Sequence, residues 1–292
     1  MTASISSRCH ALLSNSPGYE IPTVGLDSRL ENGNFGNEME SQKYYFNQRN
    51  CKKLKNDEAK LKQRIALACR ICYEEGMCEQ LGPEFAGHIS IRTGPNRILM
   101  PGHLHDSGRG LKDIRADDII AVDLNGKRLE GKHDPVEEVV IHTSIYKARS
   151  DAKSVVHLHA PFSTAIASSA SNILPIMLKS CYFVDTPILD IGPTLLKDEK
   201  TTSIMAKKLG DRQALIHKGH GIVTVGRSLE EACTLALFLE GSARMQYISG
   251  QFGRLVPFTR EQALDFAKKG NFVEDSSYWR YFENKWKDRL EN

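Results

Sequence analysis

The sequence predicts an α/β fold in which a mixed sheet is layered with helices. Short apolar segments rich in β-branched residues alternate with longer segments whose apolar residues recur at helical spacing. With 40% hydrophobic and 26% charged residues, the composition is that of an ordinary globular protein, and 292 residues suffice to bury a sizeable core.

Composition divides the chain into two regions. Residues 1–55 are rich in Ser, Asn, Gly and Glu and show no sustained apolar period, which predicts a flexible N-terminal extension. Residues 56–292 carry the regular pattern and are predicted to form one domain.

The overall charge and the apolar runs argue against several classes of partner. A formal net charge of +3, spread along the chain, is too small and too diffuse to favour nucleic acid. No apolar run approaches the ~18 residues that would span a bilayer, and the first residues lack a secretory pattern. We therefore expect a cytoplasmic protein without membrane or nucleic-acid partners.

The domain is expected to begin with a helix from about Asp57 to Gly76. Its apolar residues form one stripe: Leu61, Ile65, Ala68 and Cys72. Cys69-x-x-Cys72 lies within this helix, and because no second CxxC follows, buried thiols are favoured over a zinc or redox pair. In a reducing cytosol none of the seven cysteines is expected to form a disulfide.

Strands, helices and turns follow in a regular order. Residues 88–93, 97–102 and 118–131 have the pattern of strands, and Asn125-Gly126 predicts a tight hairpin turn. The later elements are predicted at 135–150 (helix, Pro135 at its start), 153–160 (strand), 161–170 (helix, Pro161 near its start), 201–210 (helix), 213–226 (two strands around a Gly-rich turn), 228–249 (helix capped by Ser228) and 259–270 (helix).

Three histidines are candidate metal ligands. His157 and His159 occupy positions i and i+2 of a predicted strand, so their imidazoles project from the same face, about 6.5 Å apart along the strand. This spacing fits either a polar surface pair or two ligands of one cation. Gly219 and Gly221 flank His220 and permit close approach of the backbone to a bound group. Three histidines with an open position are typical of a catalytic metal site.

Glu138 lies in the first turns of the helix that precedes the histidine strand. A carboxylate near a helix N-terminus is stabilised as the anion, whereas partial burial would raise its pKa. Glu137 and Glu138 also fit the acidic residues that are common where helices begin. Alternatively, Glu138 is a fourth ligand of the metal or a general base beside it.

Five motifs occur in order between about residue 60 and residue 250: GHISIR, DDIIAVDLNGKRLEG, the E-x-x-x-H of EVVIH, ARSDAKSVVHLHAP, and HGIVTVG before a long helix. This series resembles the class II aldolase/adducin family. The resemblance implies a three-layer α/β/α class II aldolase-like fold with a central, mostly antiparallel sheet, and makes residues 56–292 the catalytic domain. It also implies a homo-oligomer, because the family usually assembles as a four-fold tetramer with sites between subunits.

The resemblance further implies roles for individual residues. In the family, the two histidines of an HxH and a later His-Gly bind a divalent metal, usually zinc, but iron, manganese or cobalt in some branches. These positions match His157, His159 and His220. The family's acid/base glutamate lies four residues before a helix histidine and matches Glu138. Adducin-like members have lost the metal histidines, whereas this chain keeps all three, which favours an enzyme.

The phosphate-binding groups of the family have no clear match here. Sugar-phosphate aldolases and epimerases hold the phosphate with a Gly-Asn turn, a Thr-Gly turn and a Ser-Ser pair before the glutamate. In this chain Gly87 is followed by His88, and Val136 and Glu137 precede the matching glutamate. Because Glu137 is acidic, it would repel a phosphate dianion, which disfavours phosphorylated sugars.

Three further residues are candidate substrate contacts. His88 is expected either to bind a carboxylate or relay a proton, or to be a hydrogen-bonded histidine where a strand begins. Arg109, in a glycine-rich loop, is a candidate anion contact. The family's aromatic proton donor, which comes from a neighbouring subunit, has no clear match, and Tyr182 and Tyr281 are the candidates.

The resulting hypothesis is a divalent-metal-dependent carbon–carbon lyase, an aldolase or decarboxylase, that acts on a small non-phosphorylated hydroxy- or oxo-acid. Zinc is the ion that the resemblance favours. Three alternatives stay open: a non-haem iron oxygenase that cleaves 2-oxo or mandelate-type aromatic acids, a sugar-phosphate aldolase or epimerase, and a non-catalytic adducin-like interaction protein.

Overall fold

The computed structural model describes residues 57–78, 87–169, 171–270 and 276–290. The predicted N-terminal extension lies outside the described residues, so its flexibility and the boundary at residue 56 stay predictions. The described residues from Lys62 onward form one compact unit. Within the described part of the chain, no helix is both long and apolar enough to cross a membrane.

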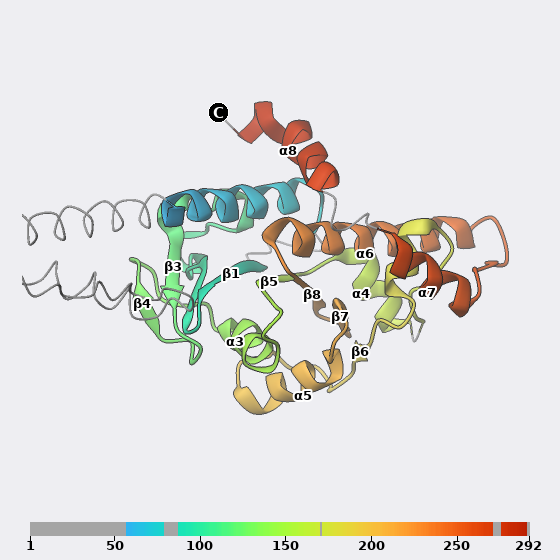
Figure 1. The fold of residues 1–292 in the computed structure, drawn as a ribbon, viewed down its shortest axis with the longest axis horizontal. Coiled ribbons are helices and arrows are strands. Elements are labelled where there is room, and N and C mark those ends of the chain that lie inside the picture. Colours follow the sequence, from blue (N-terminus) through green and yellow to red (C-terminus); the bar gives the residue numbers. More distant parts are fainter. Residues whose placement is uncertain (1–56, 79–86, 170, 271–275, 291–292) are drawn as a thin grey trace, which may run out of the picture. The chain divides into compact units, whose positions relative to one another are not determined.

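A sheet of eight described strands is the centre of the fold (Figure 1). The strands are β1 (His88–Gly94), β2 (Arg97–Pro101), β3 (Ile119–Val122), β4 (Arg128–Glu130), β5 (Ser154–Leu158), β6 (Ile188–Leu189), β7 (Ala214–His217) and β8 (Gly221–Gly226). Their order is β4-β3-β2-β1-β5-β8-β7-β6, and every neighbouring pair is antiparallel except β6 and β7. The mostly antiparallel sheet that the resemblance implies is confirmed.

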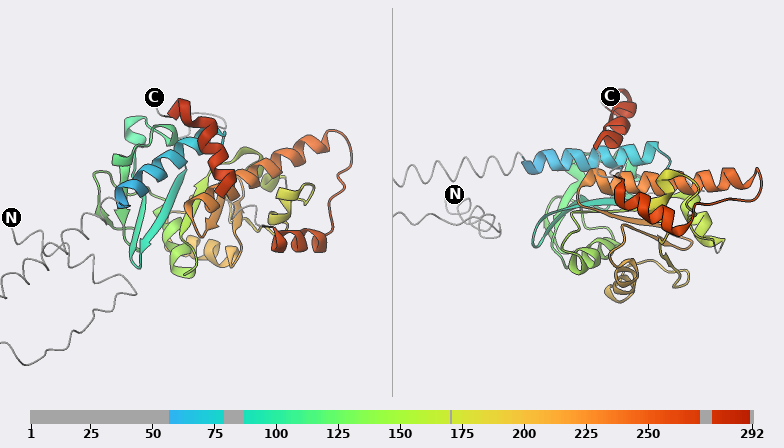
Figure 2. Two further views of the ribbon diagram at one scale, coloured as in Figure 1. Left: turned by 45° about the horizontal axis from the view of Figure 1, so that its top comes forward. Right: turned by 45° about the vertical axis from the view of Figure 1, so that its right-hand side comes forward.

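Helices cover both faces of this sheet (Figures 1 and 2). α3 (Val139–Ala148) and α5 (Glu199–Leu209) lie on one face, while α4 (Pro161–Ser168), α6 (Leu229–Gly250) and residues 62–74 lie on the other. The chain then continues through α7 (Arg260–Lys269) and α8 (Ser276–Leu290), and the short 3₁₀ helices are η1 (His105–Ser107), η2 (Leu111–Asp113), η3 (Ala116–Asp118) and η4 (Leu178–Phe183). The predicted three-layer α/β/α architecture is therefore confirmed.

Burial on both faces explains the apolar character of the central strands. Val155 of β5 belongs to the core cluster that also contains Ile141 and Ile145 of α3 and Met205 of α5. Val156, the next residue, is also fully buried and projects from the opposite face, because side chains alternate along a strand. A one-residue slip of β5 would exchange these faces, so packing fixes the register that carries the histidines.

The structure corrects one predicted helix boundary. Pro135 does not begin the helix: it pairs with Gly102 in an isolated antiparallel bridge, and α3 starts only at Val139. Glu138 is consequently the N-cap residue rather than a residue of the first turns. The predicted hairpin turn is confirmed, with Gly126 at a φ of 78° between β3 and β4.

Gly226 lies where β8 meets α6, and there is no room for a side chain. A Cβ at this position would lie 2.5 Å from the backbone nitrogen of Ala232. We predict that Gly226→Ala lowers the free energy of unfolding by about 1–3 kcal/mol, measured by urea denaturation. Gly241→Ala is the matched control, because its Cβ would meet nothing within 4 Å inside α6. That variant should be neutral or stabilising by up to about 1 kcal/mol, and equal losses in both would contradict the packing.

Candidate functional site

Three histidines and Glu138 lie close together where strand β5 ends and the neighbouring strand β8 begins. His157 is in β5 and His159 follows its last residue, while β8, the antiparallel partner of β5, starts directly after His220. Glu138 approaches from the N-terminus of α3. One ligand atom from each of these four residues lies within 4.8 Å of all the others. The structure thus brings the predicted ligand set together, and its role in binding a metal stays a prediction.

The distances within the cluster fit a small cation. His157 Nε2 lies 3.1 Å from His220 Nε2, and Glu138 Oε2 lies 3.6 Å and 3.5 Å from these two nitrogens. A tetrahedral ion with metal–ligand bonds of ~2.0–2.1 Å holds its ligand atoms about 3.4 Å apart. The donor set, three imidazoles and one carboxylate, is also one that zinc and similar divalent ions accept.

A backbone hydrogen bond fixes the protonation of His157. Its Nδ1 lies 3.0 Å from the carbonyl oxygen of Ile222 in β8. Because a carbonyl oxygen only accepts, Nδ1 must carry a proton, and Nε2 is the nitrogen that faces the cluster. Histidines that bind metals usually have such a partner on the other ring nitrogen. Since His157 is fully buried, Nε2 is shielded from bulk water.

The two oxygens of Glu138 have different partners. Oε1 accepts a hydrogen bond from the backbone N–H of Leu196 at 3.0 Å, whereas Oε2 faces His157 and His220. Burial raises the pKa of this carboxyl, as expected, but the neighbouring His157 and His220 lower it by more, so the net pKa lies well below the ordinary value. The side chain is therefore an anion suited to bind a cation.

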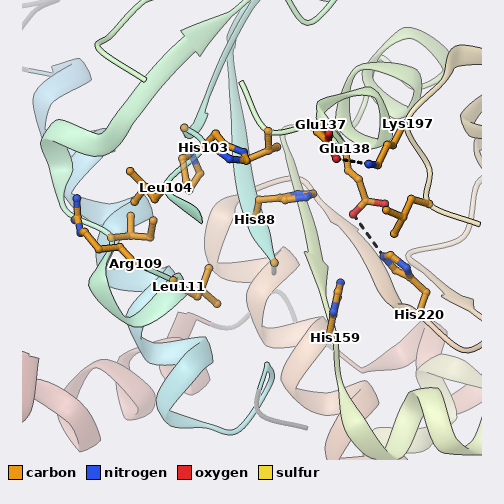
Figure 3. Close-up of a pocket in the computed structure, with 17 residues that line it drawn as sticks. His88, His103, Leu104, Arg109, Leu111, Glu137, Glu138, His159, Lys197 and His220 are labelled. Carbon is orange, nitrogen blue, oxygen red and sulfur yellow. Dashed lines mark ion pairs between the residues drawn. The ribbon is translucent and has the colours of Figure 1, made fainter. Parts of the chain in front are cut away.

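The cluster lies at the wall of a cavity of about 250 Å³ (Figure 3). Glu138, His159 and His220 line one side and point toward one another, and His88 projects between them and the loop that holds Arg109. A cavity of this size suits a small molecule rather than a polymer.

His88 connects the cavity to the protein interior. It pairs with His157 across β1 and β5, with ring centroids 5.0 Å apart, and its Nδ1 lies 2.7 Å from Nε2 of His142. Burial, followed by the neighbouring His142 and His157, holds the pKa of His88 well below its ordinary value, so the ring is neutral. His88 is thus hydrogen-bonded at the start of a strand and also lines the cavity, while its role toward a substrate stays a prediction.

Arg109 and Tyr182 lie in surroundings that the sequence did not indicate. Arg109 lines the cavity, but its Nη2 donates to Asp118 Oδ2 at 2.5 Å and to the carbonyl oxygen of Asp113 at 2.6 Å. Tyr182 is not among the described residues that line this cavity, and its hydroxyl donates to the carbonyl oxygen of Gly270 at 3.0 Å. As substrate contacts both stay predictions, and Tyr182 would have to serve the cavity of a neighbouring copy.

Two residues of the site carried no sequence signal. Lys197, just before α5, lines the cavity and forms an ion pair with Glu137 (Figure 3). His217, at the end of β7, stacks on His220 with ring centroids 4.9 Å apart and planes inclined by 26°. A lone lysine and a histidine inside an apolar strand have no motif around them, so only the three-dimensional arrangement reveals them.

Comparison with known protein families shows to which family the chain belongs. Residues 63–247 match the profile described as the Class II Aldolase and Adducin N-terminal domain. The chain belongs to the class II aldolase and adducin family. The match covers the strands, the cluster and most of α6, and it confirms the resemblance inferred from the five motifs.

Relatives of this chain are named for different activities. The 3,4-dihydroxyphthalate decarboxylase of Arthrobacter keyseri is 27% identical, over 75% of this chain and 91% of its own length. The L-fuculose phosphate aldolase of Methanococcus maripaludis is 29% identical, over 56% of this chain and 84% of its own. The solved structure of L-fuculose 1-phosphate aldolase from Glaciozyma antarctica superposes with a TM-score of 0.66 at 23% identity, over 80% of this chain and 92% of that one. The last likeness supports the fold.

Asp118 holds the loop that carries Arg109 at the cavity. Burial raises its pKa, but hydrogen bonds from Arg109, the backbone of Arg115 and His133 lower it to about 2, below the ordinary 3.8. Asp118 therefore stabilises the fold fully above about pH 4, and this contribution is lost as the pH falls through about 2. We predict that Asp118→Asn lowers the melting temperature at pH 7 and that its difference from the wild type narrows between pH 4 and pH 2.

Thermal unfolding followed across this pH range measures the effect of Asp118→Asn. Asp117→Asn is the matched control, since Asp117 is the exposed neighbour in η3. This control should melt with the wild type at every pH. A difference for Asp118→Asn that stays constant from pH 7 to pH 2 would show that ionisation of Asp118 is not the cause.

Proposed function

We propose that this chain is a divalent-metal-dependent carbon–carbon lyase, an aldolase or decarboxylase, acting on a small non-phosphorylated hydroxy- or oxo-acid. The observation that carries the proposal is the meeting of three imidazoles and an anionic carboxylate at the wall of a cavity of about 250 Å³. A scaffold protein would not require a polar cluster of this kind. Relatives named as a decarboxylase and an aldolase support an enzymatic role.

His157, His159 and His220 would hold the cation, with Glu138 as a fourth ligand before the substrate binds. When bound, the cation supplies Lewis-acid chemistry by drawing negative charge from the substrate oxygens. Zinc is the ion that we propose, because three imidazoles and one oxygen form a common catalytic zinc site. Iron, manganese and cobalt are the alternatives for the same ligands.

Glu138 is the residue that we assign to proton transfer. Leu196 anchors Oε1, which leaves Oε2 to exchange a proton in the cavity. In aldol cleavage, Oε2 takes the hydroxyl proton while the carbon–carbon bond breaks, and the proton then passes to the carbon that keeps the electron pair. In decarboxylation, carbon dioxide leaves and the same carbon takes up a proton that Oε2 has received from solvent. Both reactions therefore need one proton held at this atom.

The charges around the cavity favour a carboxylate over a phosphate dianion. Lys197 supplies a positive charge, but it is paired with Glu137, which also lines the cavity. Arg109 is held by Asp118. A phosphate needs several donors that are not already engaged by carboxylates.

Metal content tests the assignment of the ligands. We predict that the purified chain carries about one divalent ion per chain and that His157→Ala reduces this content more than tenfold, because one of three imidazole ligands is lost. Elemental analysis measures both. His133→Ala is the control, since His133 is bonded to Asp118 outside the cluster and should leave the metal content unchanged. Full occupancy in His157→Ala would exclude the proposed site.

Turnover tests the reaction and the role of Glu138. The chain is screened against hydroxy- and oxo-acids, with and without oxygen, for aldehyde, carbon dioxide and oxygen uptake. We predict that Glu138→Gln lowers kcat roughly 10²- to 10⁴-fold, whereas Glu137→Gln, the adjacent control, changes it less than tenfold. Iron-dependent oxygen uptake would establish the oxygenase instead, turnover confined to sugar phosphates would establish the aldolase or epimerase, and a chain without metal or turnover would be adducin-like.

A further inference from the structure

A chain of short hydrogen bonds leads from the cavity into the core beneath α3. His88 Nδ1 lies 2.7 Å from His142 Nε2, His142 Nδ1 lies 2.6 Å from Ser90 Oγ, and Ser90 Oγ lies 2.8 Å from the Tyr146 hydroxyl. All four side chains are buried. His88 and Ser90 share one face of β1, and His142 and Tyr146 are one turn apart on α3, so the strand and the helix present matched pairs.

The hydrogen bonds between Ser90, His142 and His88 can run in only two directions, because each neutral histidine carries one N–H. In the first, Tyr146 donates to Ser90, Ser90 donates to His142, and His142 donates from Nε2 to His88. His88 then carries its own proton on Nε2 and offers it to the cavity. In the second, His88 donates to His142 and His142 to Ser90, while Ser90 Oγ donates to the Tyr146 hydroxyl or to the carbonyl oxygen of Val155 at 3.5 Å. His88 then turns a bare lone pair toward the cavity.

The neighbouring charges favour the first arrangement. Glu138 is an anion that lines the same cavity as His88. A lone pair of His88 would be repelled by this carboxylate and by an acid substrate, whereas an N–H is attracted to both. The Tyr146 hydroxyl also has its nearest acceptor in Ser90 Oγ at 2.8 Å, since the carbonyl oxygens of Ser90 and Lys153 lie at 3.2 Å and 3.5 Å.

This chain of hydrogen bonds orients a proton and does not conduct one. Its inner end is Tyr146, which meets only Ser90 and backbone carbonyl oxygens among its described hydroxyl partners. Burial holds the pKa of Tyr146 well above its ordinary value, so the hydroxyl keeps its proton. A proton accepted at His88 therefore has no exit through the core, and the chain acts by fixing which atom of His88 is the donor.

We propose that Tyr146, Ser90 and His142 are positioning residues that hold His88 as a neutral Nε2–H donor for an anionic oxygen of the substrate. The identity of that substrate as an organic acid rests on the proposed function, whereas the tautomer of His88 does not. The bond to Nδ1 also fixes the orientation of the His88 ring, whose centroid lies 5.0 Å from that of His157.

The tautomers are measured without turnover. Long-range ¹H–¹⁵N spectra of the full chain as purified, labelled with ¹⁵N-histidine, distinguish Nδ1–H from Nε2–H rings, and His88→Gln and His142→Gln assign the two signals. The expected result is the Nε2–H form for both His88 and His142. An Nδ1–H form of either ring overturns the inference.

Kinetics with an acid found in the screen provide the second test. His142→Leu should lower kcat/KM on the order of 10- to 100-fold, mainly through KM, because a hydrogen bond to a charged oxygen is lost. His142→Gln should recover most of this loss, since its amide can donate to His88. Ser144→Ala is the matched control: it removes a buried 2.7 Å hydrogen bond from α3 to Thr202 without touching the chain of bonds.

The outcomes separate the two proposals. A loss in Ser144→Ala equal to that in His142→Leu, or no recovery in His142→Gln, overturns the positioning role. If no acid is turned over while both rings are Nε2–H, the proposed function fails and the assignment of the His88 tautomer is upheld.

Discussion

The antiparallel pairing of β5 with β8 is the constraint on which the site depends. It sets Leu158 opposite Ile222, so the chain enters β8 through Gly221 directly beside His159. A Cβ at Gly221 would lie 2.5 Å from the carbonyl oxygen of Leu158, and only glycine allows the strands to approach this closely. The same pairing provides the Ile222 carbonyl that accepts the Nδ1 proton of His157. Strand register, ring orientation and protonation therefore have one cause.

Burial makes the cluster an electrostatic site that is suited to a cation. Burial, then the neighbouring rings, lowers the pKa of His142 and of His159 to about 3 and of His217 to about 4, so these imidazoles are neutral near pH 7. Glu138 is an anion among them. A buried carboxylate is costly unless a positive charge or hydrogen-bond donors compensate it. A divalent ion would satisfy the carboxylate and the rings together.

The scaffold around the cluster is held by two further buried carboxylates. Asp118 joins the Arg109 loop to the segment of His133. Glu240 of α6 accepts hydrogen bonds from the backbone of Phe162 and from Ser163, and thereby caps α4 immediately after the histidine strand. Because each carboxylate satisfies several donors from distant parts of the chain, the loops that border the cavity have defined positions without belonging to strands or long helices.

The sequence by itself determined the features that depend on neighbouring residues. Alternation along a strand placed His157 and His159 on one face, flanking glycines marked His220, and the capping pattern at Ser228 located α6. Five ordered motifs identified the family and, with it, the three-layer α/β/α architecture. These signals can be read from the sequence because each involves only a few consecutive residues.

Only the tertiary structure decided the features that depend on residues far apart in the chain. It decided the net pKa shift of Glu138, because two histidines 19 or more positions away lie beside its carboxylate and outweigh the effect of burial. It engaged Arg109 with Asp118, brought Lys197 to the cavity, and joined His88 to Tyr146 through the core. The two-residue strand β6 had too short a pattern to be seen. Burial and charge at one atom are sums over spatial neighbours, and the linear order of residues does not specify those neighbours.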